Sequence, residues 1–150
     1  LIGTGFTDEP LKNLPETLHT LILAQCADLR MSFICDLPKG LHHLDVRAAD
    51  YFGNQHLPLL PPELRILNCS ATGVKNSGLF NMPKVTPTSP SFFPPQPTNG
   101  TSEHMSFSLK NLSTLYIYSC MVSQKGLATM PSFHRCNILY TASMAAFCND

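Results

Sequence analysis

The feature that most constrains the fold of this chain is a segment that recurs at a fixed interval. Its first three copies are LPETLHTLIL from Leu14, LPKGLHHLDV from Leu37 and LPPELRILNC from Leu60, at intervals of 37 − 14 = 23 and 60 − 37 = 23. A fourth copy, NLSTLYIYSC from Asn111, keeps the same spacing of apolar residues. A period of this length is typical of repeat architectures, in which each unit buries its apolar side against its neighbours.

Each unit predicts one short strand and one short helix. The L-x-L alternation gives a strand with one buried face and one exposed face. The lead-in to the first copy, FTDEPLKNLP from Phe6, carries apolar residues three apart, which fits one or two helical turns. Proline then ends the helix. We therefore expect an α/β fold in which units stack into a parallel strand ladder, with helices on the other side.

The repeated pattern resembles a leucine-rich repeat: L-x-x-L-x-L is followed three residues later by Cys26, Ala49, Thr72 or Cys120. The lead-in FTDEPLKNLP is similar to the TD-x-G-L-x-x-L segment of the cysteine-containing class, which is common in the substrate-binding half of F-box proteins. The resemblance covers Phe6 to Pro83 and Asn111 to Pro131. It implies a leucine-rich-repeat solenoid, although the chain has no F-box motif and its period is shorter than is usual for that class.

The regular repeat interval is interrupted between the third and fourth copies. Leu64 and Leu112 are separated by an interval of 112 − 64 = 48, which is about twice the repeat interval. The segment 85–110 has a length of 110 − 85 + 1 = 26, and without it the interval becomes 48 − 26 = 22, close to one repeat. The removed segment is rich in Pro, Ser and Thr, and its prolines are incompatible with a strand ladder. The predicted organisation is leucine-rich repeats over 1–84, a disordered insertion over 85–110, a further repeat over 111–131 and an irregular tail over 132–150.

Two origins for the insertion stay open. It is either a surface loop, which a repeat protein tolerates well, or an intron translated as coding sequence, since Lys84-Val85 and SFSLK match what splice sites would encode. The tail from Ser132 is either a second readthrough or an irregular end. The chain begins at Leu1 without a methionine or a signal-peptide pattern, so we expect a fragment.

Composition excludes several classes of partner. Ten basic and ten acidic side chains give a net charge of zero, which argues against nucleic acid. No apolar run approaches the ~20 residues that a membrane span needs. The cysteines fit buried thiols in a reducing compartment, so we expect a cytoplasmic location. The sequons at Asn68, Asn99 and Asn111 would instead suit an extracellular repeat protein.

The sequence predicts no catalytic, cofactor or metal site. None of the six cysteines forms a C-x-x-C pair, which argues against zinc. His42 and His43 lie near Asp45, but no positioned nucleophile accompanies them, and His43 and Asp45 fit outward strand positions better than a general base. A phosphate-cradling glycine loop is also missing from the sequence. We therefore expect a protein that is not an enzyme.

What remains is the exposed face of the strands, the usual partner surface of a solenoid. Strand alternation places outward Thr20, Ile22 and Ala24, then His43, Asp45 and Arg47, then Ile66, Asn68 and Ser70, and finally Thr114, Tyr116 and Tyr118. The predicted partner-binding residues are His43, Asp45, Arg47, Asn68, Tyr116 and Tyr118. Tyrosine and arginine are frequent interface hot spots, although the two tyrosines could equally serve strand propensity alone.

The favoured function is therefore a protein-interaction module that binds a partner on its concave strand face. By resemblance, it would be the substrate-recognition part of an F-box-type ubiquitin ligase. Two alternatives stay open: a truncated or mis-spliced gene product without independent function, and an extracellular leucine-rich-repeat protein.

Overall fold

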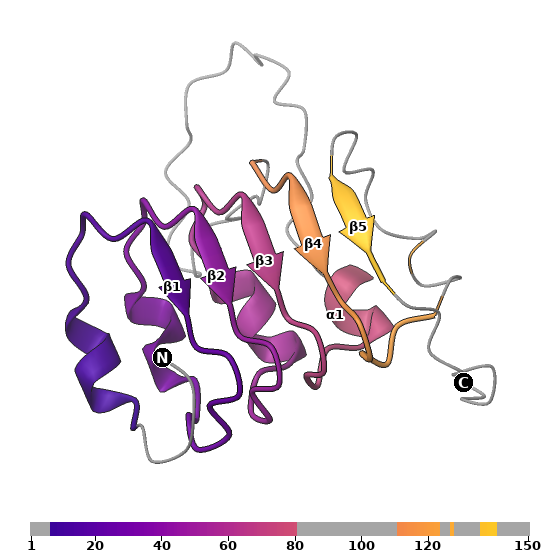
Figure 1. Cartoon of the computed structure of the whole chain (residues 1–150), viewed down its shortest axis with the longest axis horizontal. Coiled ribbons are helices and arrows are strands. Elements are labelled where there is room, and N and C mark those ends of the chain that lie inside the picture. Colours follow the sequence, from indigo (N-terminus) through magenta and orange to yellow (C-terminus); the bar gives the residue numbers. More distant parts are fainter. Residues whose placement is uncertain (1–6, 81–110, 124–126, 128–135, 141–150) are drawn as a thin grey trace, which may run out of the picture.

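The computed structural model describes residues 7–80, 111–123, 127 and 136–140. Within these residues the chain forms one parallel sheet in the strand order β1-β2-β3-β4-β5 (Figure 1). The strands are β1 (Thr20–Ile22), β2 (His43–Asp45), β3 (Ile66–Asn68), β4 (Thr114–Tyr116) and β5 (Asn137–Leu139). The prediction of parallel strands accompanied by short helices is confirmed at this level.

Neighbouring strands pair in a register that reproduces the sequence period. Leu21 pairs with Leu44, Leu44 with Leu67, and Leu67 with Leu115. β3 and β4 are direct neighbours, although Leu67 and Leu115 lie more than two periods apart in the sequence. The predicted insertion at 85–110 falls between these two strands and lies outside the described residues.

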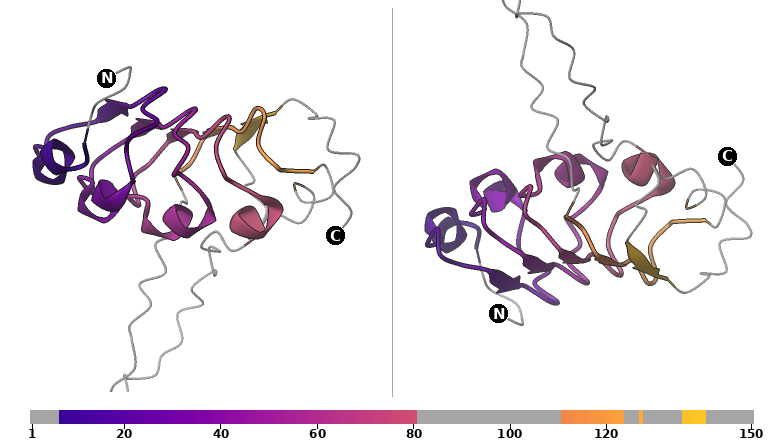
Figure 2. Two further views of the ribbon diagram at one scale, coloured as in Figure 1. Left: turned by 90° about the horizontal axis from the view of Figure 1, so that it is seen from below. Right: turned by 90° about the horizontal axis from the view of Figure 1, so that it is seen from above.

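Short helices form a second layer on one face of the sheet (Figure 2). Three are 3-10 helices, η1 (Glu9–Asn13), η2 (Ser32–Asp36) and η3 (Asn54–Leu59), and one is the α-helix α1 (Asn76–Phe80). The 3-10 helices end where the Leu-Pro pairs predict. Leu14, Leu37 and Leu60 have extended backbone, with ψ of 143°, 138° and 146°, because the following proline disfavours the helical region.

The core lies between the sheet and the helices. The first four strands contribute one inward leucine each, and the helices contribute one aliphatic residue each, all at most 8% exposed: Leu21, Leu44, Leu67 and Leu115, with Leu11, Ile34, Leu57 and Leu79. Burying one such side chain stabilises a fold by about 1.5–3 kcal/mol. The repeated pairing of a strand leucine with a helix aliphatic residue therefore accounts for much of the stability.

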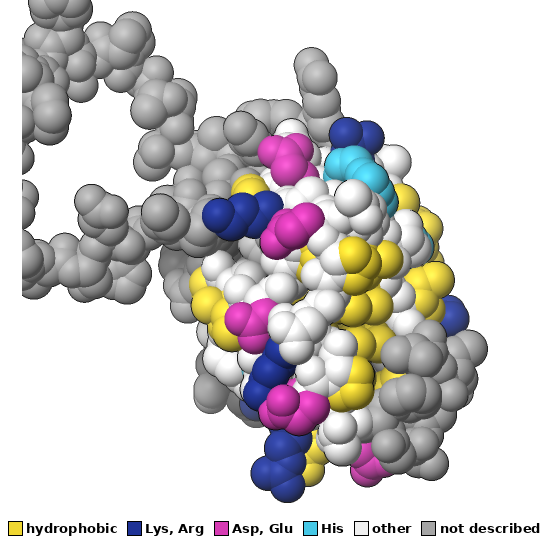
Figure 3. Space-filling model, turned by 90° about the vertical axis from the view of Figure 1, so that its left-hand side faces the viewer, with side chains coloured by type: hydrophobic (Ala, Val, Ile, Leu, Met, Phe, Trp, Pro, Cys, Tyr) yellow, Lys and Arg dark blue, Asp and Glu magenta, His cyan; other side chains and the backbone are white. Residues whose placement is uncertain are grey.

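The first unit buries its apolar residues less completely than the units behind it. Leu14 and Leu18 are half-buried, whereas Leu37 and Leu41, at the equivalent positions one period later, are 7% and 0% exposed. Figure 3 views this end of the sheet and shows a band of apolar side chains beside a row of charged ones. The difference arises because β1 has a neighbouring strand on one side only among the described residues.

Each of the first four strands is followed, three residues after its end, by a residue in the left-handed region. These residues are Gln25, Ala48, Ala71 and Ser119, with φ of 60°, 54°, 53° and 55°. The conformation costs a non-glycine residue about 1–2 kcal/mol. Its recurrence at one place indicates that the turn is required there, since the next residue in the first and fourth units, Cys26 and Cys120, is buried in the core.

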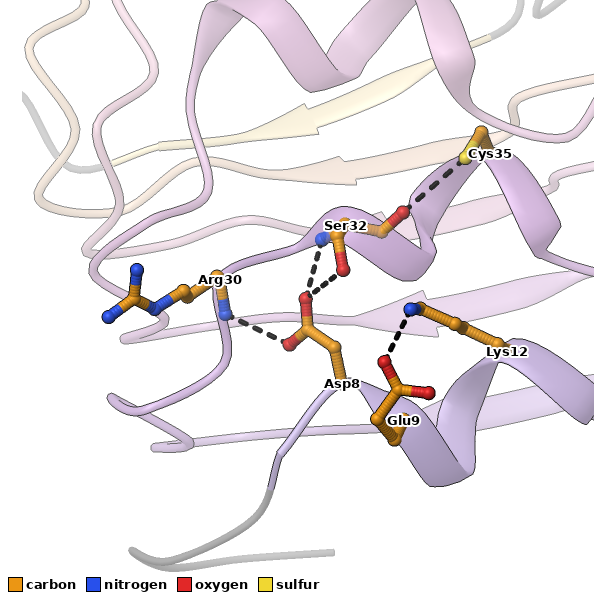
Figure 4. A network of polar contacts seen from close by, with 6 residues as sticks. All are labelled: Asp8, Glu9, Lys12, Arg30, Ser32 and Cys35. Carbon is orange, nitrogen blue, oxygen red and sulfur yellow. Dashed lines mark hydrogen bonds and ion pairs between the residues drawn. The ribbon is translucent and has the colours of Figure 1, made fainter.

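A carboxylate links the first two helices, η1 and η2, by hydrogen bonds. Asp8 precedes η1, and its two oxygens accept hydrogen bonds from the backbone nitrogens of Arg30 at 2.9 Å and Ser32 at 2.7 Å, at the start of η2 (Figure 4). The first N–H groups of a helix have no partner within the helix. Asp8 therefore caps the helix of the following unit.

Asparagines repeat this lateral bond in later units. Asn54 accepts from the backbone nitrogen of Lys75 at 2.8 Å, and Asn76 accepts from that of Ser123 at 2.9 Å. The equivalent residue of the second unit is Met31, which is 1% exposed and has a φ of 66°. A methionine cannot accept in the same way, and the backbone nitrogen of Gly53, at the start of the next helix, donates instead to His56 Nδ1 at 3.1 Å.

The predicted irregular tail needs a correction at Asn137–Leu139. These residues form β5, which pairs in parallel with β4 so that Ile138 lies beside Leu115. The sequence hides this strand because Ile138 alone keeps the apolar pattern of the other units. Arg135 stands three residues before Ile138, where the other units have leucine, and Tyr140 stands two residues after it.

Candidate binding surface on the open strand face

We define the open strand face as the side of the sheet opposite the helices. It is formed by the first and third residue of each strand and by the residue two positions after β2, β3 and β4, which are Arg47, Ser70 and Tyr118. Burial alternates along β1, β3 and β4, in which only the middle residue is buried, whereas β2 buries Asp45 as well as its middle residue Leu44. The predicted residues His43, Asp45, Arg47, Asn68, Tyr116 and Tyr118 therefore share one face, as strand parity predicts.

Asp45 ends β2 on this face and is 6% exposed. The prediction that it is an exposed residue is wrong. Its Oδ1 accepts from the backbone nitrogen of Arg47 at 3.1 Å, and its Oδ2 accepts from Asn68 Nδ2 at 3.4 Å. Because these neighbours surround the carboxylate and satisfy it, Asp45 organises the face and is poorly placed to contact a partner directly.

Asn68 extends the same arrangement to the next strand. Its Oδ1 accepts from the backbone nitrogen of Ser70 at 3.2 Å, which repeats the bond between Asp45 and Arg47 one unit later. Ser70 Oγ in turn accepts from the backbone nitrogen of Tyr118 at 3.1 Å. The chain of bonds from Asp45 through Asn68 and Ser70 fixes the ends of three neighbouring strands.

Arg47 is the charged side chain that this network leaves accessible. Its side chain is 51% exposed, and Nε lies 3.6 Å from Asp45 Oδ2. An ion pair at this exposure contributes less than about 1 kcal/mol to stability. The contact with Asp45 therefore orients the guanidinium more than it stabilises the fold.

The open strand face also carries large aromatic and aliphatic side chains among its polar residues. Tyr116 and Tyr118 are half-buried and their ring centroids are 6.3 Å apart, with the rings tilted by 42°. Ile22 and Leu139 are 39% and 38% exposed at the two edges of the sheet. The pair of tyrosine rings presents apolar area together with phenolic hydroxyl groups, which suits protein recognition.

Two further residues that were predicted to point outward, His43 and Ala24, are less exposed than this prediction implies. His43 is half-buried at the start of β2, where its backbone nitrogen donates to the His19 carbonyl at 3.0 Å. Ala24, predicted to point outward, is 1% exposed. A methyl group extends too little to stay accessible beside larger neighbouring side chains.

The described cysteines form no disulfide with one another, and three of them are buried: Cys26, Cys69 and Cys120. The Cys120 thiol donates to the carbonyl of Cys69 at 3.0 Å and so ties the fourth unit to the third. The Cys120 thiol and burial together raise the pKa of Cys69. The buried position of Cys69 fits a structural role for this residue.

The parts of the chain that the structure describes contain no cluster of three or more His, Cys, Asp or Glu residues able to hold a metal ion. Those same parts include no helix with the length and apolar character needed to cross a membrane.

Comparison with known proteins finds no family model that matches the chain and no curated protein that matches it. A function for this chain is therefore inferred from the geometry of the open strand face and from the sequence pattern.

Proposed function

We propose that this chain is a leucine-rich-repeat solenoid that binds a protein partner on its open strand face. One observation carries the proposal: five parallel strands leave one face of the sheet without a covering helix in the described residues. Exposed strand faces of repeat proteins form extended binding surfaces. The partner would contact Tyr116 and Tyr118, together with Arg47, which lies two strands away on the same face.

The composition of the face supports protein over other partners. Tyrosine and arginine are enriched in interface hot spots, where rigid rings contribute contact area at a small loss of conformational entropy. The chain has a net charge of zero, which gives nucleic acid little electrostatic attraction.

The resemblance to the cysteine-containing class suggests a more specific role, the recognition of substrates for an F-box-type ubiquitin ligase. Cys120, which stands at the cysteine position of the pattern, donates to the backbone of the preceding unit, and this bond supports the resemblance. The burial of Cys26, Cys69 and Cys120 fits the expected buried thiols of a protein in a reducing, cytoplasmic compartment.

The proposal is tested with a random peptide library displayed on phage and selected against the whole chain. Affinities of the selected peptides are then compared between the wild type, Tyr116→Ala and Tyr51→Ala. Tyr51 is the matched control, because it is 53% exposed and lies in the turn after β2. We expect Tyr116→Ala to weaken binding about tenfold or more and Tyr51→Ala to leave it unchanged. Equal affinities for all three proteins would show that the open strand face is not the binding surface.

A further inference from the structure

The Arg47 side chain has N–H donors without a partner among the described residues. Only its Nε is paired, at 3.6 Å from Asp45 Oδ2, and within the described residues its two terminal nitrogens have no partner. A guanidinium carries five N–H donors in a rigid fork, and four of them belong to the terminal nitrogens. The contact with Asp45 therefore directs the fork while leaving its outer edge available.

The acceptor that would normally compete for this fork is already occupied. Asp45 is 6% exposed and accepts from the backbone nitrogen of Arg47 and from Asn68 Nδ2. Arg47, Ser70 and Tyr118 occupy the same position after three consecutive strands. Ser70 Oγ accepts from the backbone nitrogen of Tyr118, so its own hydroxyl hydrogen can donate outward. This row of residues presents donors in the described part of the face and no unpaired carboxylate.

We propose that the open strand face recognises an extended peptide segment of its partner through an acidic side chain, bound by Arg47, and an apolar side chain, bound by Tyr116 and Tyr118. This inference rests on the proposed function and adds the chemical class of the partner. A carboxylate matches the fork geometry of arginine and accepts two parallel hydrogen bonds.

The spacing of the strands sets the spacing of the peptide motif. Arg47 and Tyr118 follow strands that are two places apart in the sheet, which corresponds to about 10 Å. An extended chain advances about 3.3 Å per residue, and the arginine side chain has considerable reach. The acidic and apolar residues of the peptide are therefore two to four positions apart.

The test uses the peptides selected from the displayed library. We expect them to be enriched in Asp or Glu two to four positions from an apolar residue. Arg47→Gln should lower their affinity about five- to tenfold, and Arg30→Gln should not, since Arg30 is exposed in the segment before η2. The affinity of the wild type should also fall with rising salt, and that of Arg47→Gln should change much less.

A change on the peptide gives the same answer without altering the protein. Replacing the acidic residue of the peptide by its amide should lower the affinity for the wild type about five- to tenfold, as Arg47→Gln does. It should not lower the affinity for Arg47→Gln any further, because both changes remove the same contact. The inference would be overturned if the selected peptides showed no acidic enrichment and bound Arg47→Gln as tightly as the wild type. The proposed function would still stand in that case if the same peptides lost affinity for Tyr116→Ala. Failure to select any peptide, or indifference to both variants, would overturn both.

Discussion

Asp8 and Ser32 hold the first two helices together, although they belong to different units of the sequence. Asp8 Oδ2 lies 2.7 Å from the backbone nitrogen of Ser32, and the Ser32 hydroxyl donates to the same oxygen at 2.5 Å (Figure 4). Asp8 makes no side-chain cap bond to η1, the helix that it precedes. Its contribution is therefore to holding η1 beside η2.

Removal of this carboxylate should loosen the first unit. Hydrogen bonds to a charged group are worth more than neutral ones, but Asp8 is partly exposed, so we expect Asp8→Ala to lower the free energy of unfolding by about 1 kcal/mol. Urea unfolding at neutral pH measures the change. The control is Glu9→Ala, since Glu9 is exposed and pairs with Lys12 on the surface. An equal loss in both variants would contradict the lateral role of Asp8.

The same carboxylate makes stability depend on pH in the acid range. Burial alone would raise the pKa of Asp8, but the hydrogen bonds from Ser32 and Arg30 outweigh it and lower the pKa below its usual 3.8. The unfolded chain then binds the proton more readily, so the contribution is present above about pH 4 and is lost as pH falls through the folded pKa. The difference between wild type and Asp8→Ala should shrink on acidification from about pH 5 to about pH 3.

His56 introduces a second pH dependence, nearer to neutrality. Its Nδ1 accepts a hydrogen bond from the backbone nitrogen of Gly53 at 3.1 Å, which requires an unprotonated nitrogen, and burial lowers the pKa of His56. A lowered folded pKa means that the stabilising contribution is present above the unfolded pKa of about 6.5. It is lost as pH falls below that value.

The variant His56→Gln separates this effect from the other histidines. A glutamine at the third helical position can accept the same backbone bond but does not titrate. We expect the free energy of unfolding to fall between about pH 7.5 and about pH 5.5 in the wild type and in the control His43→Gln. It should fall less in His56→Gln. The same slope in all three proteins would exclude His56 as the cause.

Ala48 and Ala49 form a natural pair for testing the recurrent left-handed turn. Ala48 has a φ of 54°, whereas Ala49 is 0% exposed and is not among the residues with positive φ. Glycine adopts the left-handed region without steric penalty, which outweighs its greater loss of backbone entropy at Ala48. Ala48→Gly should stabilise the protein by about 0.5–1 kcal/mol, and Ala49→Gly should destabilise it by about 1 kcal/mol or more. Thermal unfolding distinguishes these signs, and a loss of stability in both would refute the strain.

The sequence predicts the regular part of this fold because the period and the alternation act on the same residues. Leu21, Leu44 and Leu67 are both periodic and inward, so strand, register and core follow from one pattern. The pattern does not predict contacts between polar side chains on neighbouring strands. Parity places Asp45 on the open strand face, but its burial depends on Asn68 and Arg47. The fifth strand cannot be predicted from the pattern either, because Ile138 is the one residue of that segment that matches the apolar positions of the other units.

Two leucines of the third unit separate the core from the surface of the helices. Leu67 is 0% exposed at the centre of β3, and Leu59 is 48% exposed at the end of η3. Leu67→Ala removes a side chain enclosed by the sheet and helices and should lower the free energy of unfolding by about 2–5 kcal/mol. Leu59→Ala should change it by about 0.5 kcal/mol or less. Tyr116→Ala, on the open strand face, should resemble Leu59→Ala. If it instead unfolded the protein as Leu67→Ala does, Tyr116 would belong to the core, and the surface proposed for partner binding would have to be abandoned.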